Sequence, residues 1–218
     1  MGRRLLLPLY FGKITVSGQE YLPTEGPIIL APTHRARWDS IVLPVAAGRP
    51  VTGRDLRFMV TSDEVKGLQG WFIRRLGGFP VNVRRPTISS LRHGIDLLLD
   101  RAMLVIYPEG GIFRDNRVHR LKPGLARLAV QAEDIEPGLG VRIVPVSLHY
   151  EQPFPSWRSR VHITFGQPLV VADYISHDST AEALKAQAKQ LTADLQNSLV
   201  ALSVGSQPSS CSESSSAA

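Results

Sequence analysis

Short runs of apolar and β-branched residues alternate along this chain with segments whose apolar residues recur three or four positions apart. The first pattern predicts strands and the second predicts helices. The predicted strands are residues 28–31, 57–61, 79–83, 103–107, 141–148 and 161–165. The predicted helices are residues 39–47, 63–76, 88–99, 124–132 and 179–202. This alternation is typical of βαβ units, so the fold class is predicted to be α/β, with a mostly parallel sheet flanked by helices.

The chain has no internal repeat and no linker in its middle, which predicts a single domain over residues 1–203. Residues 204–218 are rich in serine and poor in apolar residues, so they are predicted to form a disordered tail. Residues 179–182 have the pattern of a capping box at the start of the last helix. Pro145 lies inside a predicted strand and therefore indicates a sheet edge or a bulge.

The first candidate functional residues follow the strand at residues 28–31. His34 and Asp39 are separated by four residues across the loop that leads from this strand to the next helix. In an α/β fold, functional groups gather in loops beyond the carboxyl ends of the strands. Since a histidine can accept a proton near neutral pH and a carboxylate can orient its ring, His34 is a candidate general base and Asp39 its partner. The alternatives are a hydrogen-bonded loop histidine and an aspartate that only caps the helix.

A second group follows the short strand at residues 79–83. Arg84 and Arg85 place two guanidinium groups in the loop after this strand. A guanidinium matches phosphate oxygens through paired hydrogen bonds, so both arginines are candidate phosphate ligands. A solvated basic turn is the alternative interpretation.

A third group, Pro-Glu-Gly-Gly at residues 108–111, follows the most apolar strand of the chain. Glu109 can accept a hydrogen bond from a substrate hydroxyl or from an arginine, while Gly110 and Gly111 let a substrate approach the backbone. Lys122 lies just before the helix at residues 124–132, where a cation and the free amides of a helix start favour an anion. These four residues are predicted to bind substrate. A glycine-rich turn with a surface glutamate is the alternative.

Composition narrows the choice of partners. The formal net charge of +6 favours anionic partners, whether phosphorylated substrates, anionic lipids or nucleic acid. The chain carries no RNA-binding signature, so nucleic acid is not an expected partner. The single cysteine, Cys211, excludes a disulfide within the chain and a thiolate metal site. The six histidines lack the spacing of metal ligands, so no metal is expected.

The sequence contains no apolar run close to the roughly 18 residues of a membrane-spanning helix. The apolar stretch after Arg3 and Arg4 is short for a signal peptide and no small-residue cleavage site follows it, so we expect a cytoplasmic protein that attaches peripherally to the cytoplasmic face of a membrane. Two segments are candidate contacts with an anionic bilayer: residues 3–9, two arginines followed by mostly apolar residues, and residues 71–75, with two aromatic residues and two arginines. Burial of the aromatic residues at 71 and 72 in the core is the alternative.

The order of the motifs H-x4-D, G-x5-R, Pro-Glu-Gly and Val-Pro-Val resembles that of the glycerolipid acyltransferases, the 1-acyl-sn-glycerol-3-phosphate (lysophosphatidate) acyltransferases in particular. The resemblance covers about residues 11–165 and implies a glycerol-3-phosphate acyltransferase-like fold. It implies that His34 is the general base and Asp39 its orienting residue. By the same resemblance, Arg84, Glu109 and Gly110 bind the phosphate and glycerol of the acceptor, and residues 144–146 shape the acyl side.

Two positions depart from the pattern of this family. Thr33 precedes the histidine where the family often has asparagine. Gly111 and Ile112 follow Pro-Glu-Gly where the family usually has threonine and a polar residue. A side chain that could contact the acceptor phosphate is therefore missing, and Arg114, Arg85 or Lys122 are candidates to replace it.

The resemblance implies transfer of a fatty acyl group from acyl-CoA or acyl-carrier protein to the sn-2 hydroxyl of 1-acylglycerol 3-phosphate, giving phosphatidate for phospholipid synthesis. The hydroxyl attacks the thioester directly, in agreement with the lack of a G-x-S-x-G nucleophile motif. No cofactor is implied, since the acyl thioester is a co-substrate. Two alternatives stay open: another acceptor, such as glycerol 3-phosphate or a lysophospholipid, and a basic anion-binding module without catalytic activity.

Overall fold

The structure is a computed structural model that describes residues 11–61, 77–81, 88–176 and 180–205. Its strands are β1 (Lys13–Ser17), β2 (Ile28–Pro32), β3 (Leu56–Thr61), β4 (Gly78–Val81), β5 (Met103–Val105), β6 (Arg142–Tyr150), β7 (Arg160–Phe165) and β8 (Leu169–Val170). Its α-helices are α2 (Asp39–Ala47), α3 (Arg49–Thr52), α5 (Ile88–Leu99), α6 (Gly124–Ile135) and α7 (Ala181–Gly205). Two short 3-10 helices are η1 (Gln19–Tyr21) and η3 (Val171–Tyr174).

The strands form one mixed sheet in the order β1-β7-β6-β2-β5-β3-β4, with β8 paired to the start of β6. The five strands from β6 to β4 are parallel to one another. Strand β7 pairs antiparallel with β6, and β1 pairs parallel with β7. The predicted α/β fold with a mostly parallel sheet is therefore confirmed.

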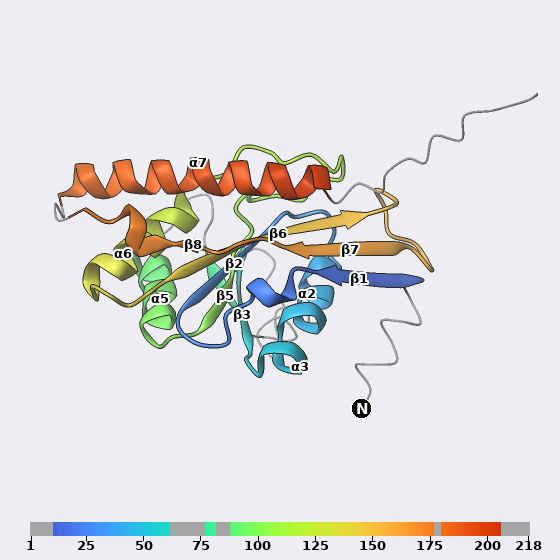
Figure 1. Ribbon diagram of the computed structural model, residues 1–218, viewed down its shortest axis with the longest axis horizontal. Coiled ribbons are helices and arrows are strands. Elements are labelled where there is room, and N and C mark those ends of the chain that lie inside the picture. Colours follow the sequence, from blue (N-terminus) through green and yellow to red (C-terminus); the bar gives the residue numbers. More distant parts are fainter. Residues whose placement is uncertain (1–10, 62–76, 82–87, 177–179, 206–218) are drawn as a thin grey trace, which may run out of the picture.

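Helices cover the two faces of this sheet (Figure 1). Alternate residues of a strand point to opposite faces, and β2 is buried on both. Ile28 and Leu30 pack in a cluster with α2, whereas Ile29 and Ala31 pack in a cluster with α5, α6 and α7. Because β2 lies between two apolar layers, the loop that follows it at residue 33 starts from a rigid position.

The predicted elements agree with the structure in most of the described segments. The predicted strand at residues 103–107 ends earlier, at Val105, and the predicted helix at residues 124–132 continues to Ile135. Strands β1 and β8 were not predicted, because β1 mixes polar and apolar residues and β8 has only two residues. The predicted helix at residues 63–76 and the extended residues 82–83 lie outside the described residues.

The last helix is capped by Thr180, whose hydroxyl oxygen accepts a hydrogen bond from the amide of Ala183 at 3.3 Å. Ser179, the first residue of the predicted capping box, lies outside the described residues. Helix α7 continues to Gly205 and so includes residues 204 and 205, which were predicted to belong to the tail, while the single domain over residues 1–203 stays a prediction. Residues 206–218 of the predicted tail lie outside the described residues.

Pro145 occupies a central strand, so the expectation of a sheet edge was wrong. Its carbonyl oxygen accepts a hydrogen bond from the amide of Gly166 at 2.9 Å, on the side of β6 that faces β7 and β8. The nitrogen and carbonyl of one strand residue point to the same side, so the nitrogen of Pro145 faces the break between β7 and β8. The break removes the need for a donor there, which explains how β6 accommodates a proline.

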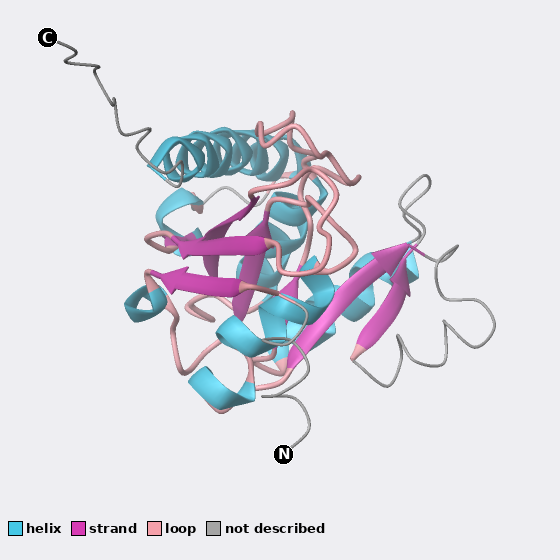
Figure 2. Ribbon diagram, turned by 90° about the vertical axis from the view of Figure 1, so that its right-hand side faces the viewer, coloured by secondary structure: helices cyan, strands magenta, loops and turns pink. Residues whose placement is uncertain are grey.

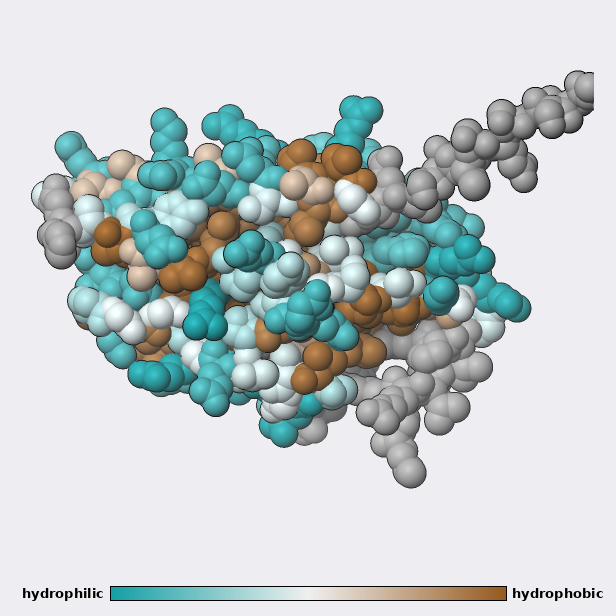
Figure 3. All heavy atoms as spheres, viewed as in Figure 1, coloured by the Kyte–Doolittle hydropathy of each residue, from teal (hydrophilic) through white to brown (hydrophobic). Residues whose placement is uncertain are grey.

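Loops between strands and helices lie beside α7 in the view from the right-hand end of the molecule (Figure 2). The surface is largely hydrophilic on the face seen in Figure 3, but apolar side chains gather over the C-terminal part of α7, where Val200 and Val204 are exposed. Within the described ranges, no helix has both the length and the hydropathy needed to span a membrane.

Candidate active site

His34, in the loop after β2, is in direct contact with Asp39, the first residue of α2. The Nδ1 atom of His34 lies 2.8 Å from Oδ2 of Asp39, and Asp39 is fully buried. Since an ionised carboxylate can only accept hydrogen bonds, Nδ1 carries the proton that is shared with Asp39. The predicted pairing of a histidine with an orienting carboxylate is thus present in the geometry of the site.

The carboxylate of Asp39 is held by three further donors. The backbone amides of Arg35 and Ala36 donate to Oδ2 at 2.7 and 3.0 Å, and the hydroxyl of Tyr150 donates to Oδ1 at 2.8 Å. Both amides precede α2, and the start of this helix has no side-chain cap. Asp39 therefore organises the loop that carries His34, and the alternative that it only caps the helix is wrong.

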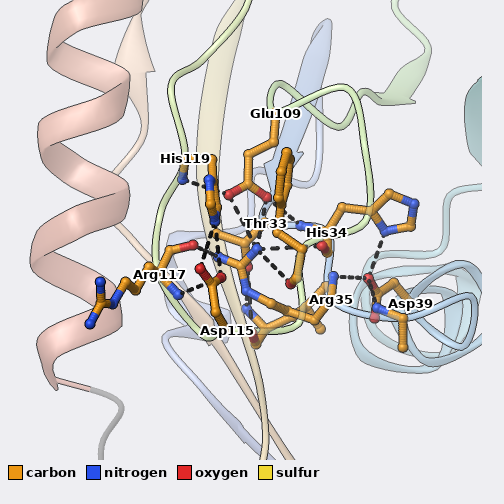
Figure 4. A network of polar contacts seen from close by, with 11 residues as sticks. Thr33, His34, Arg35, Asp39, Glu109, Asp115, Arg117 and His119 are labelled. Atoms are coloured by element: carbon orange, nitrogen blue, oxygen red, sulfur yellow. Dashed lines mark hydrogen bonds and ion pairs between the residues drawn. The ribbon is translucent and has the colours of Figure 1, made fainter. Parts of the chain in front are cut away.

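The ring of His34 is stacked on the ring of Tyr107, with centroids 3.9 Å apart and an angle of 20° between the planes. The second ring nitrogen, Nε2, points away from the polar network in Figure 4, and no described residue forms a hydrogen bond with it. The side chain of His34 keeps 17% exposure. The imidazole is thus fixed on one edge and one face, while its proton-accepting edge is open to a substrate.

Two tyrosine hydroxyls next to Asp39 stay protonated. Burial, followed by the charge of Asp39, raises the pKa of Tyr107 well above its usual value. Burial and the charge of Asp39 likewise raise the pKa of Tyr150. Tyr150 therefore remains a donor to Asp39 across the whole physiological pH range.

Glu109 connects the His34 loop to the loop at residues 111–123 (Figure 4). Its carboxylate accepts hydrogen bonds from the backbone amides of His34 at 2.8 Å and His119 at 2.9 Å. It also forms a buried ion pair with Nη1 of Arg35, at 2.9 and 3.2 Å from its two oxygens. Arg35 in turn donates from Nη2 to the carbonyl oxygen of Arg117 at 2.8 Å.

These contacts explain what Glu109 does in the described structure. Its side chain is fully buried, and both of its oxygens accept from protein donors. The sequence predicts either a substrate hydroxyl or an arginine as a donor to Glu109, and the structure contains the arginine, Arg35. Contact of Glu109 with a substrate stays a prediction, whereas its role in holding the backbone of His34 follows directly from the geometry.

The glycine turn after Glu109 is exposed to solvent at Gly110. Gly110 has a φ of +69°, the left-handed region that glycine adopts most easily. A Cβ at this position would lie 2.5 Å from Nζ of Lys122, so the lysine side chain passes directly over the glycine backbone. Gly110, Gly111 and Lys122 are thus next to one another, as expected of residues that share a ligand, and their binding role stays a prediction.

Arg84 and Arg85 lie outside the described residues, so their predicted contact with phosphate stays a prediction. Thr33 uses its hydroxyl oxygen to accept a hydrogen bond from the amide of Leu148 at 2.9 Å, and its own amide donates to Val146 at 2.9 Å. Thr33, which stands where the acyltransferases that the sequence resembles often have asparagine, therefore joins the end of β2 to β6 directly beside His34.

A family model described as Acyltransferase matches residues 13–149, well over half of the chain, and this range contains His34, Asp39 and Glu109. The chain belongs to this acyltransferase family. The resemblance found in the sequence is thereby confirmed.

Several proteins that are similar to this chain in sequence are named as acyltransferases. The 1-acyl-sn-glycerol-3-phosphate acyltransferase of Streptococcus pneumoniae is 30% identical over 156 residues, which are 68% of this chain and 52% of that protein. The protein of the same name from Bacillus subtilis is 25% identical over 185 residues, 83% of this chain and 85% of that protein. Glycerol-3-phosphate O-acyltransferase 1 of Saccharomyces cerevisiae is 32% identical over 103 residues, 45% of this chain and 13% of the yeast protein. This acyltransferase-family chain thus spans about half the length of the pneumococcal relative.

A solved structure shares the fold. The crystal structure of the 1-acyl-sn-glycerophosphate (LPA) acyltransferase PlsC from Thermotoga maritima superimposes with a TM-score of 0.62 at 20% identity. The match covers 95% of this chain and 78% of the Thermotoga chain. The acyltransferase-like fold expected from the sequence is therefore confirmed.

Three residues of the network in this family member were not singled out from the sequence: Arg35, Tyr107 and Tyr150. Arg35 is a charged residue beside the candidate histidine, which is a signal of function. The local sequence pattern, however, does not predict that Arg35 is buried. Tyr107 ends the predicted strand at residues 103–107, and Tyr150 follows His149 just after the strand predicted at residues 141–148; neither tyrosine gave a signal of its own. Their roles depend on contacts with residues 73 and 111 positions away, which only the folded chain creates.

Proposed function

We propose that this protein transfers a fatty acyl group from acyl-CoA or acyl-carrier protein to the sn-2 hydroxyl of 1-acylglycerol 3-phosphate, giving phosphatidate. The observation that carries the proposal is the contact of His34 Nδ1 with the buried carboxylate of Asp39 at 2.8 Å, with Nε2 open to a substrate. The relatives from Streptococcus pneumoniae and Bacillus subtilis, both named 1-acyl-sn-glycerol-3-phosphate acyltransferase, support the choice of acceptor.

The site supports direct transfer between the two substrates. Nε2 of His34 accepts the proton of the sn-2 hydroxyl while the hydroxyl oxygen attacks the thioester carbonyl carbon. The carbon–sulfur bond of the tetrahedral intermediate then breaks, and the leaving thiolate takes the proton from His34. Asp39 stabilises the imidazolium between the two steps, because its charge lies 2.8 Å from Nδ1. The products are an ester and a free thiol, and His34 returns to its initial state.

The phosphate of the acceptor needs cationic or amide donors. Lys122 supports this part of the proposal, because its side chain is exposed and passes over the Gly110 backbone, one residue from Glu109. We assign Arg84 and Arg85 to the same phosphate from their guanidinium chemistry alone. The turn at Gly110, which is exposed, and Gly111, which is half-buried, lets the glycerol part of the acceptor approach the backbone.

The proposal includes no metal and no cofactor, since a histidine–carboxylate pair is sufficient for proton transfer in acyl transfer to a hydroxyl. It also includes peripheral attachment to the cytoplasmic face of a membrane, because an acceptor with a fatty acyl chain resides in a bilayer and the chain has a net charge of +6.

Glycerol 3-phosphate is the second candidate acceptor. The yeast relative named glycerol-3-phosphate O-acyltransferase 1 favours it, at 32% identity over 103 residues. Both acceptors offer a glycerol hydroxyl and a phosphate monoester, so the His34–Asp39 pair serves either reaction. Only 1-acylglycerol 3-phosphate carries an acyl chain, so an assay with each acceptor in turn distinguishes the two reactions directly.

The test is acyl transfer by the purified protein with radiolabelled 1-acylglycerol 3-phosphate or glycerol 3-phosphate, each with acyl-CoA and with acyl-carrier protein. We expect labelled phosphatidate from the first acceptor, and loss of product in His34→Ala although the variant remains folded. His93→Ala, which changes a histidine of α5 in contact with Phe79, is the matched control and should retain activity. Folded wild-type protein that acylates neither acceptor with either donor would contradict the proposal.

A further inference from the structure

The loop between β6 and β7, residues 151–159, holds two large aromatic side chains in solvent. Phe154 is 71% exposed and Trp157 is 63% exposed. Side chains of this size usually bury most of their surface, because each removes a large apolar area from water. Their joint exposure within four residues therefore indicates a contact surface.

Hydrogen bonds fix the backbone of this loop. The amide of Ser156 donates to Oγ of Ser159 at 2.8 Å, and the hydroxyl of Ser156 donates to Oε1 of Gln152 at 2.7 Å. The loop is also joined to the chain before β1, since the amide of Gly12 donates to the carbonyl oxygen of Ser159 at 3.1 Å. The two aromatic side chains are thus exposed by an ordered loop, so little conformational entropy would be lost when they bind.

One arginine contacts one of these aromatic side chains, and two further arginines follow them in the chain. The guanidinium of Arg114 lies 4.7 Å from the centre of the Phe154 ring. Arg158 is exposed beside Trp157, and Arg160 follows as an exposed residue paired with Glu151 at 3.3 Å. Aromatic rings beside arginines are suited to an anionic lipid surface, where the ring enters the headgroup layer and the cation meets phosphate.

The loop also lies on the correct side of the molecule. Strand β6 is parallel to β2 and continues four residues beyond Val146, the partner of the last residue of β2. Tyr150, at the end of β6, donates to Asp39, and its carbonyl oxygen accepts from Asn116 at 3.4 Å. The loop therefore projects beyond the same sheet edge from which the His34 loop starts.

We propose that residues 151–159 dock the protein on an anionic lipid bilayer, with Phe154 and Trp157 inserted at the level of the headgroups. This surface consists of other residues than the segments at residues 3–9 and 71–75, which lie outside the described residues. It rests on the proposed function in one respect: an acceptor that resides in the bilayer would then face the edge that carries His34. Docking itself requires no turnover.

The test is flotation of the full chain with vesicles of phosphatidylcholine and phosphatidylglycerol that contain no acceptor. We expect the double variant Phe154→Ser, Trp157→Ser to partition roughly tenfold less than wild type, a factor that corresponds to about 1.4 kcal/mol. Ile135→Ser is the matched control, because Ile135 is 60% exposed at the end of α6. It should partition like wild type. Added salt should weaken wild-type binding, since the arginines act through charge.

A second readout follows tryptophan fluorescence during binding to vesicles with brominated lipid. Quenching should occur in wild type and decrease in Trp157→Phe. Equal partition of the double variant and wild type would overturn the proposal, as would an equal loss in Ile135→Ser. A change in oligomeric state without a change in vesicle binding would also overturn it, because the loop would then be a contact between copies. Since the vesicles contain no substrate, these outcomes are independent of whether the acyl-transfer proposal holds.

Discussion

Tyr150 donates its hydroxyl proton to Oδ1 of Asp39 across 2.8 Å, although the two residues are 111 positions apart in the chain. The other carboxylate oxygen, Oδ2, lies 2.8 Å from Nδ1 of His34. The last residue of β6 thus fixes the carboxylate that orients the candidate base. Tyr150 is a positioning residue, because it acts through Asp39.

Tyr150→Phe removes this donor and keeps the buried ring. We expect it to lower the free energy of unfolding by about 1.5–3 kcal/mol, the range for a hydrogen bond to a charged group. We also expect kcat to fall roughly tenfold, equivalent to about 1.4 kcal/mol in the barrier, with little change in KM. Chemical denaturation and steady-state acyl transfer measure the two effects.

Tyr174→Phe is the matched control for this prediction. The hydroxyl of Tyr174 donates to Asp194 at 3.0 Å, between η3 and α7. This variant loses a hydrogen bond of the same type away from His34, so its kcat should match that of wild type. If both variants lost the same fraction of kcat, a specific role of Tyr150 would be refuted.

The ion pair of Arg35 and Glu109 is the second test of how the site is held. Glu109→Gln leaves a buried guanidinium without its counter-charge, so the free energy of unfolding should decrease by about 3–5 kcal/mol. Asp55→Asn removes one partner of the exposed Arg49–Asp55 pair and should leave the urea midpoint nearly unchanged. Equal urea midpoints for Glu109→Gln and wild type would show that the pair does not hold the loop.

Gly110→Ala tests the turn beside Lys122. A side chain at a φ of +69° costs about 1–2 kcal/mol, and the new Cβ would lie 2.5 Å from Nζ of Lys122, which must move. We expect lower stability and a higher KM for the acceptor. Gly124→Ala is the control, because its Cβ would meet nothing within 4 Å at the start of α6 and alanine favours a helix. An unchanged KM for the acceptor in Gly110→Ala would show that this turn does not contribute to acceptor binding.

The lowered pKa of His149 predicts how the free energy of unfolding depends on pH. Burial lowers the pKa of His149 below its usual value, and the charges of His162 and Arg35 lower it further, against an opposite effect of Glu151. The unfolded chain then binds a proton at higher pH than the folded protein does. Stability should therefore decrease as the pH falls from about 6.5 toward the folded pKa.

His149→Gln should reduce this decrease, because glutamine does not titrate. Urea denaturation at several values between about pH 8 and pH 5 measures the slope of stability against pH. The same slope in the variant and in wild type would exclude His149 as its source.

The local pattern of the sequence was sufficient for much of the fold. The strand before Thr33 and the helix from Asp39 to Ala47 were predicted with nearly correct bounds, because apolar runs and helical spacing are local signals. The pair of His34 and Asp39 was also predictable, since five positions across one loop keep two side chains close. Strand β1 escaped prediction because its residues are only partly buried.

The sequence by itself thus determined the α/β class, the order of most elements and the identity of the candidate base and its carboxylate. Only the tertiary structure decided that Glu109 is buried against Arg35, that Tyr150 supports Asp39, and that residues 151–159 project from the sheet edge that carries His34. The physical reason is that a side-chain hydrogen bond needs a separation near 3 Å. Between residues more than 70 positions apart, such a separation follows from the order and register of the strands, which no local pattern encodes.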